Sequence, residues 1–124
     1  MHELAICQAL IDEVQRVAQA QRAERVAGVR VRCGALAGVV PELLYRAYEV
    51  ARAGTLAEEA TLTIEESPVR VRCPRCGNES AVSVQRLACP ACGEWRTEVV
   101  AGDELLLMSV ELIKADDARP VGRA

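Results

Sequence analysis

The stretch Cys73-Pro74-Arg75-Cys76-Gly77 returns as Cys89-Pro90-Ala91-Cys92-Gly93, with twelve residues between the two cysteine pairs. Two residues between paired cysteines let both thiolates reach one ion, and the glycine that follows lets the backbone turn tightly beneath the sulfurs. Two such loops facing each other build the tetrahedral sulfur site that Zn2+ prefers in structural positions. The sequence therefore predicts a zinc site with four ligands: Cys73, Cys76, Cys89 and Cys92.

Three other uses of paired cysteines compete with structural zinc. A redox dithiol needs one pair and not two. Rubredoxin-type iron uses similar loops, but the chain has only three aromatic side chains to shield an iron centre. A nucleic-acid-binding or regulatory zinc ribbon is the alternative function, because the region is locally basic, although glutamates are interspersed. Its arginines are Arg70, Arg72, Arg75, Arg86 and Arg96. A closed four-thiolate site leaves no open position for zinc-hydroxide catalysis.

The composition of the whole chain narrows the class of protein. The chain has 124 residues and a net charge of −3, which disfavours nucleic acid as the partner. No segment reaches the roughly 18 apolar residues of a membrane span, and the Met-His-Glu start is unlike a signal peptide. We therefore expect a cytoplasmic protein with reduced thiols, without a membrane or nucleic-acid partner.

Outside the cysteine module, hydrophobic periodicity predicts an α+β fold. Spacings of three and four from Leu4 onward predict a helix, and alternation from Val26 to Cys33 predicts a half-buried strand. We expect two helices packed on a three-stranded sheet, with an inserted zinc-ribbon-like module. The predicted domains are 1–70 plus 99–113 for the α/β body, 71–98 for the zinc module and 114–124 for a flexible tail. The predicted elements are helices over 4–21 and 41–53 and strands over 26–33, 61–66, 69–72 and 105–113, with Leu106, Met108, Val110 and Leu112 on one face of the last strand.

The amino-terminal residues form a second candidate metal site. His2 is the only histidine, and an initiator methionine is normally retained before a bulky residue, so we expect the mature chain to begin at Met1. The free amine, the amide and imidazole of His2 and the amide of Glu3 then lie within a few bonds of each other. Such nitrogen donors suit a square-planar ion, either Ni(II) or Cu(II). A terminal histidine without any role is the simpler reading. Binding here would release protons and be labile, which suits a carrier.

Several motifs occur in one order along the chain. They are Met1-His2-Glu3-Leu4, the Gly34-Ala35-Leu36-Ala37-Gly38-Val39 turn followed by Pro41-Glu42, and the paired Cys-Pro-x-Cys-Gly loops. Together they closely resemble the HypA/HybF family of nickel metallochaperones for NiFe-hydrogenase maturation, over about residues 1–113.

The resemblance implies a binding and delivery protein and not an enzyme. It implies transferable Ni(2+) at Met1, His2 and Glu3, and structural Zn(2+) at the four cysteines of the paired loops. It also implies partners: a nickel-handling maturation GTPase, the hydrogenase large subunit and, for some members, urease maturation proteins. The chain would be a monomer or a homodimer. Cys7 and Cys33 fit best as small core residues outside the zinc cage.

Overall fold

The computed structural model describes residues 2–114 and confirms the predicted α+β class. The chain forms two compact units. Within the described residues, unit 1 holds 2–31, 40–63 and 107–114, and unit 2 holds 32–39 and 64–106. Apart from Lys114, the predicted tail at 114–124 lies outside the described residues.

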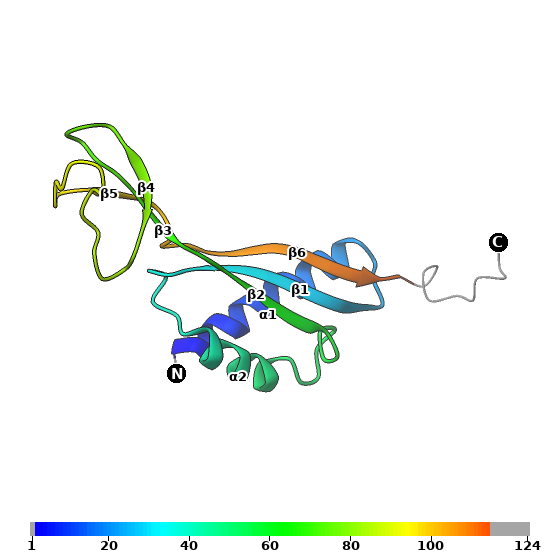
Figure 1. Ribbon diagram of the computed structural model, residues 1–124. Coiled ribbons are helices and arrows are strands. Elements are labelled where there is room, and N and C mark those ends of the chain that lie inside the picture. Colours follow the sequence, from blue (N-terminus) through cyan, green and yellow to red (C-terminus); the bar gives the residue numbers. More distant parts are fainter. Residues whose placement is uncertain (1, 115–124) are drawn as a thin grey trace. The chain divides into compact units, whose positions relative to one another are not determined.

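Two amphipathic helices form one layer of unit 1. α1 spans His2–Ala20 and α2 spans Pro41–Ala51, close to the predicted limits. Pro41 begins α2 at a position where its missing N–H costs nothing. The helices pack against each other and, within unit 1, lie on the same side of the strands (Figure 1). Their buried side chains follow the predicted stripes: Cys7, Ile11, Val14 and Ala18 on α1, Leu44 and Tyr48 on α2.

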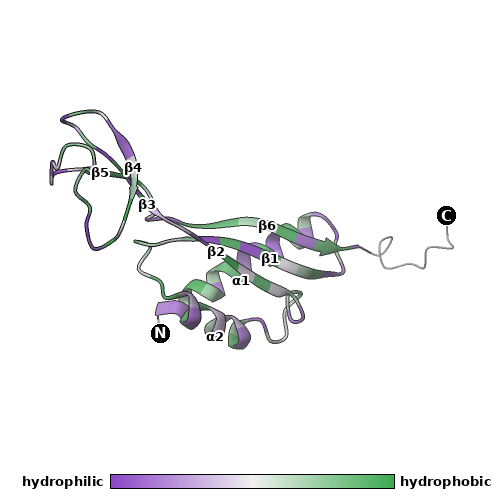
Figure 2. Cartoon of the chain, viewed as in Figure 1, coloured by the Kyte–Doolittle hydropathy of each residue, from purple (hydrophilic) through white to green (hydrophobic). Residues whose placement is uncertain are grey.

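The predicted three-stranded sheet has the order β2-β1-β6. β1 spans Arg25–Gly34, β2 spans Thr61–Ser67 and β6 spans Leu105–Ile113. Burial along β1 follows the predicted alternation, with Val29 and Val31 buried and Arg30 exposed between them. Figure 2 shows the same alternation as purple and green bands along β1. Pro68 separates β2 from the next strand, as expected of a residue that cannot donate to a ladder.

The face assigned to β6 from its sequence was wrong in its first half. Leu106 and Met108 are 45% and 41% exposed, whereas Val110 and Leu112 are half-buried. Met108 and Ser109 are exposed in succession, so the alternation shifts by one residue there. Because residues 105–108 are all apolar, their pattern could not tell the inward face from the outward one.

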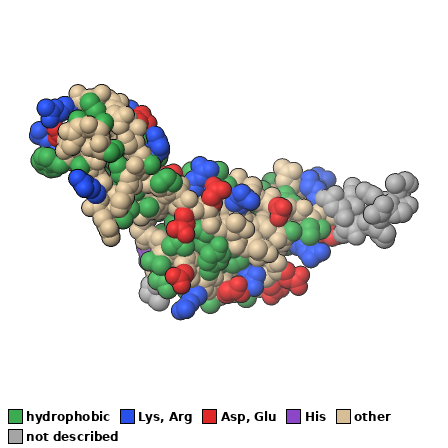
Figure 3. All heavy atoms as spheres, viewed as in Figure 1, with side chains coloured by type: hydrophobic (Ala, Val, Ile, Leu, Met, Phe, Trp, Pro, Cys, Tyr) green, Lys and Arg blue, Asp and Glu red, His purple; other side chains and the backbone are tan. Residues whose placement is uncertain are grey.

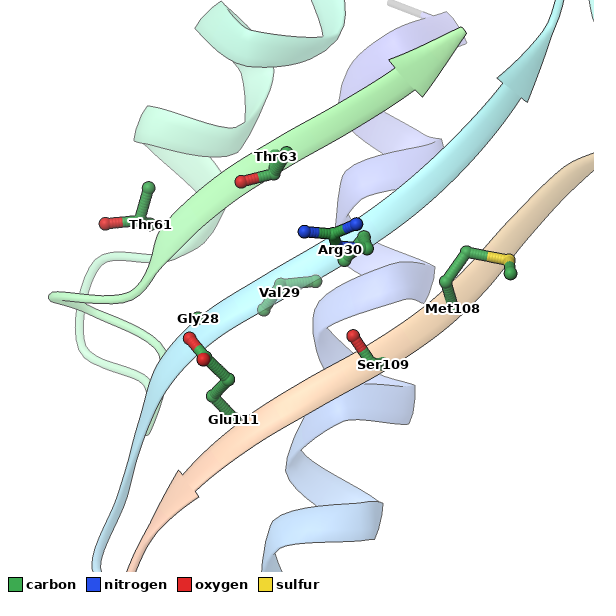
Figure 4. A pocket seen from close by; sticks show the side chains of 8 residues that line it. All are labelled: Gly28, Val29, Arg30, Thr61, Thr63, Met108, Ser109 and Glu111. Atoms are coloured by element: carbon green, nitrogen blue, oxygen red, sulfur yellow. The ribbon is translucent and has the colours of Figure 1, made fainter. Parts of the chain in front are cut away.

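The side of the unit 1 strands opposite the helices carries a shallow hollow of about 510 Å3. Figure 4 shows Arg30 from β1, Thr61 and Thr63 from β2 and Glu111 from β6 around it, with helices behind the strands. Gly28 contributes no side chain, and the Glu111 carboxylate occupies the space that a Cβ would need. The lining has no cysteine or histidine, so it offers none of the soft donors expected for the predicted metals.

A second sheet, which the sequence did not predict, belongs to unit 2. β3 spans Val69–Arg72 and lies between β4, Glu79–Val82, and β5, Glu98–Ala101. Both pairings are antiparallel, and the pairing with β5 shifts register between Arg70 and Val71. β4 and β5 have four residues each, which is too short for a reliable period of two. This sheet carries both cysteine loops.

Candidate metal centres

The two cysteine loops have the same backbone structure. In the first, the N–H of Gly77 donates to the carbonyl of Cys73 over 2.8 Å, and the N–H of Cys73 donates to the carbonyl of Asn78 over 2.9 Å. In the second, Gly93 donates to Cys89 and Cys89 donates to Glu94 over the same two distances. Gly77 and Gly93 adopt φ of 78° and 80°, which disfavours any side chain there. The sequence repeat is therefore a repeat in structure.

These loops bring the four predicted zinc ligands together. The Sγ atoms of Cys73, Cys76, Cys89 and Cys92 all lie within 4.8 Å of one another. The Cys73–Cys92 pair is 3.5 Å apart and the Cys76–Cys89 pair 3.7 Å apart. Four sulfurs at 2.3 Å from one zinc ion would stand about 3.8 Å apart, so the cluster fits structural Zn2+. Among residues 2–114 it is the only cluster of three or more cysteine, histidine or acidic side chains arranged for a metal.

Backbone N–H groups prepare two of the thiols for metal binding. The N–H of Cys76 lies 3.4 Å from the Sγ of Cys73, and this donor lowers the pKa of Cys73. The corresponding N–H of Cys92 lowers the pKa of Cys89 to about 7. Both sulfurs are also buried. Zinc binds the thiolate form, so these donors favour the ligand state of Cys73 and Cys89.

A further contact supports the second loop and was missed from the sequence. The hydroxyl of Thr97 donates to the carbonyl of Leu87 over 2.6 Å and ties together the two ends of the segment around Cys89 and Cys92. No motif marks this threonine, because one hydroxyl beside a loop has no characteristic spacing.

Glutamates of the module neutralise part of its basic character. Arg72 forms ion pairs with Glu79 on one neighbouring strand and Glu98 on the other. Arg96 pairs with Glu94 at 3.3 Å. Two of the five arginines on which the nucleic-acid alternative depends are therefore engaged within the module, which weakens that alternative.

The predicted nickel residues lie at the start of α1 in unit 1. His2 is exposed as the first residue of the helix, and Glu3 is half-buried in its first turn. Met1 lies outside the described residues. An acidic residue in the first turn suits the helix dipole, and the first N–H groups of a helix have no intrahelical acceptor.

The remaining two cysteines lie apart from the zinc cluster. Cys7 is fully buried, and its Sγ lies 3.4 Å from the carbonyl oxygen of Leu44. Burial, with a contribution from Glu3, raises the pKa of Cys7 to about 11. Burial also raises the pKa of Cys33. Both are core residues, and their raised pKa values make them unreactive thiols.

The fold and the site together define a class: a small α+β metal-binding protein with a four-cysteine module that fits structural zinc. The family model described as "Hydrogenase/urease nickel incorporation, metallochaperone, hypA" matches residues 1–112. The chain therefore belongs to the HypA family, the nickel metallochaperones of hydrogenase maturation, and the resemblance noted in its sequence is confirmed.

Individual relatives agree over nearly their whole lengths. The hydrogenase maturation factor HypA of Nitrosospira multiformis is 50% identical over 113 residues, covering 91% of this chain and 98% of that protein. The factor of the same name from Streptomyces avermitilis is 45% identical over 112 residues, with 89% and 86% covered. A solution structure of the Ni metallochaperone HypA from Helicobacter pylori has a TM-score of 0.68 at 23% identity, covering 90% of this chain and 97% of that one. That structure has the same fold.

Proposed function

We propose that the chain carries Ni(II) on Met1, His2 and Glu3 and passes it on, while zinc in the four-cysteine cluster holds the second unit together. One observation carries the proposal: the only histidine of a chain in the nickel metallochaperone family is exposed at the first turn of α1. An exposed site can release its ion, whereas a closed sulfur cage exchanges metal poorly.

The chemistry of the helix start supports a proton-coupled nickel site. The N–H groups of the first turn lack helical acceptors, so their nitrogens are available as ligands. A cation at a helix N-terminus is disfavoured by the dipole, but deprotonation of the amides on binding would reverse the local charge. The Glu3 carboxylate in the same turn would add to that compensation. Nickel affinity should therefore rise with pH over the range in which these nitrogens lose their protons.

The wider setting is also part of the proposal. We take the chain to be a carrier without catalytic activity, acting in the cytoplasm as a monomer or homodimer. Its partners would be a nickel-handling GTPase, the hydrogenase large subunit and urease maturation proteins, with no role for nucleic acid or a membrane. Among the described residues, no helix is long and apolar enough to cross a bilayer.

A nickel titration of the zinc-loaded protein tests the site. The unmodified chain is compared with His2→Ala, with a chain acetylated at its amine, and with Asp12→Asn as a matched control on the same helix. Asp12 is exposed two turns or more from the amino terminus, so its loss should leave nickel affinity unchanged. Blocking the amine or removing the imidazole should abolish the tightest nickel binding while zinc content and helicity persist. Equal binding by the acetylated chain would overturn the proposal.

Copper provides a second measurement on the same site. Nitrogen donors bind Cu(II) more tightly than Ni(II) by the general order of divalent affinities. The proposal therefore expects copper to displace nickel from the unmodified chain, with loss of one set of square-planar absorption bands and gain of another. Selectivity for nickel would then come from metal availability and from docking to the correct partner.

A further inference from the structure

The zinc module exposes a tryptophan that its own folding does not use. Trp95 is 74% exposed, and it is the only tryptophan in the chain. The guanidinium of Arg96 lies over its ring, 5.4 Å from the centroid. Tryptophan and arginine are the side chains that most often dominate the energy of protein interfaces. An exposed pair of this kind contributes little to the stability of the module and is accessible to a partner.

A shallow, open hollow of about 640 Å3 in unit 2 is lined by residues from both cysteine loops. Pro74 and Arg75 come from the first loop, and Glu94 and Arg96 follow the second. Each of these residues is within four positions of a predicted zinc ligand, so the metal cage fixes the walls of the hollow relative to each other. On the visible surface of this unit, Figure 3 shows basic side chains beside hydrophobic ones, with a few acidic ones among them.

The charges around the hollow leave one guanidinium available. The carboxylate of Glu94 accepts hydrogen bonds from both the backbone N–H and the Nε of Arg96. Within residues 2–114, Arg75 forms no ion pair, although its positive charge contributes to lowering the pKa of Glu94. Two arginines face one glutamate, which leaves an excess of one positive charge at the rim. A guanidinium with free donors is suited to bidentate recognition of a carboxylate.

We propose that Arg75, Trp95 and Arg96 form a docking surface for an acidic segment of a partner protein, in which a carboxylate of the segment pairs with Arg75 and an apolar side chain covers the tryptophan beside Arg96. This inference deepens the proposed function and rests on it, since a metal carrier must dock the protein that gives or receives its cargo. A nucleic acid fits the surface less well. The surface offers a single tryptophan ring on which bases could stack.

The single tryptophan provides a direct measurement, because all tryptophan fluorescence comes from the proposed surface. The zinc-loaded full chain is titrated with three synthetic peptides that share a leucine anchor and differ in four positions: all glutamate, all glutamine or all lysine. Oligo(dT) is titrated in parallel. We expect only the glutamate peptide to shift the emission to shorter wavelength and to protect Trp95 from acrylamide quenching.

Arg75→Gln and Arg86→Gln form the matched pair of variants. Both remove one exposed charge from the module, but Arg86 lies outside this hollow. Loss of one charged hydrogen-bonding contact should lower the affinity for the glutamate peptide about tenfold in Arg75→Gln. The affinity should fall less than twofold in Arg86→Gln. Absence of binding, equal binding of the three peptides, equal effects of the two variants, or tighter binding of oligo(dT) would each overturn the inference. Nickel titration of Arg75→Gln should match the unmodified chain, so failure of docking and failure of the nickel site are distinguishable.

Discussion

Gly34, at the end of β1, approaches another part of the backbone of unit 2 so closely that alanine cannot fit. A Cβ on Gly34 would lie 2.2 Å from the carbonyl oxygen of Gly102 and 2.3 Å from its carbonyl carbon. Two hydrogen bonds hold this approach in place. Gly34 donates to the carbonyl of Glu104 over 2.8 Å, and Leu36 donates to the carbonyl of Gly102 over 2.7 Å. Gly34→Ala therefore tests whether this close backbone approach requires glycine at position 34.

The expected loss follows from the distances. Ordinary contact begins at 3.4 Å, so the backbone around Gly102 would have to move by about 1 Å or more. Forcing extra atoms into a packed site costs about 1–3 kcal/mol, and weakening two backbone hydrogen bonds adds about 1 kcal/mol for each bond lost. The lower conformational entropy of the unfolded chain with alanine offsets this loss by about 0.5 kcal/mol. We expect Gly34→Ala to lower the free energy of unfolding of unit 2 by about 3 kcal/mol.

Two other glycines separate steric clash from backbone conformation. Gly38 has φ of +76° with nothing within 4 Å of its Cβ position, so Gly38→Ala should cost only about 1 kcal/mol for the left-handed conformation. At Gly28 the clash is with the end of the Glu111 side chain, which can rotate away, so Gly28→Ala should cost least.

Urea unfolding of the zinc-loaded variants gives the comparison. Fluorescence of Trp95 follows unit 2, to which Gly34 and Gly102 belong, while far-ultraviolet circular dichroism follows the helices of unit 1. The fluorescence midpoint should fall most for Gly34→Ala. If Gly34→Ala is no less stable than Gly38→Ala, the argument from close backbone approach is wrong.

Two predictions concern the core of unit 1. Tyr48→Phe removes the hydrogen bond of its hydroxyl to the carbonyl of Ala60, 2.9 Å long, but Arg52 still donates to that carbonyl over 3.1 Å; the cost in urea unfolding should therefore be about 1 kcal/mol, and a loss above about 3 kcal/mol would contradict this account. The pKa of Cys7 is raised from 9.0 to about 11, so the folded state favours the neutral thiol. This preference should contribute at most about 3 kcal/mol to the free energy of unfolding, a contribution that is complete below pH 9 and is lost as the pH rises through 11. Cys7→Ala should remove this part of the decline between pH 8 and 11, and an unchanged slope would assign the decline to other groups.

The parts of the fold that were predicted from the sequence are those in which one local pattern has one structural solution. Cys7, Ile11 and Val14 repeat at helical spacing and are buried on one side of α1. Val29 and Val31 alternate with arginines, and the strand there follows that alternation. The paired cysteines needed only their spacing and their glycines, because two identical loops can meet around one ion in few ways.

The parts that were missed depend on contacts between distant segments. β4 exists because residues 79–82 pair in register with residues 69–72. A pattern of four residues cannot predict such a pairing. The inward face of β6 was missed because residues 105–108 are all apolar, and only the pairing of β6 with β1 in the sheet decides which of them face inward. Trp95 illustrates the same limit for function, because only the structure shows that this side chain is 74% exposed.

A structural metal and a transferable metal need sites that differ in how easily the ion is released. Cys73 and Cys89 are buried, and backbone N–H groups lower the pKa of both thiols, which favours the metal-binding thiolate form. Metal release from this cage would mean breaking four sulfur–metal bonds. His2 is exposed on the first turn of a helix, and under the proposed assignment the nitrogen ligands there could regain their protons one at a time. A carrier that used the sulfur cage for its cargo would have to unfold the cage at each delivery. Under the proposed assignment, zinc instead fixes the Arg75 and Arg96 walls of the docking surface, and nickel can leave without disturbing them. Partner binding would then survive nickel release, and it should be lost when a chelator strong enough to remove zinc is added.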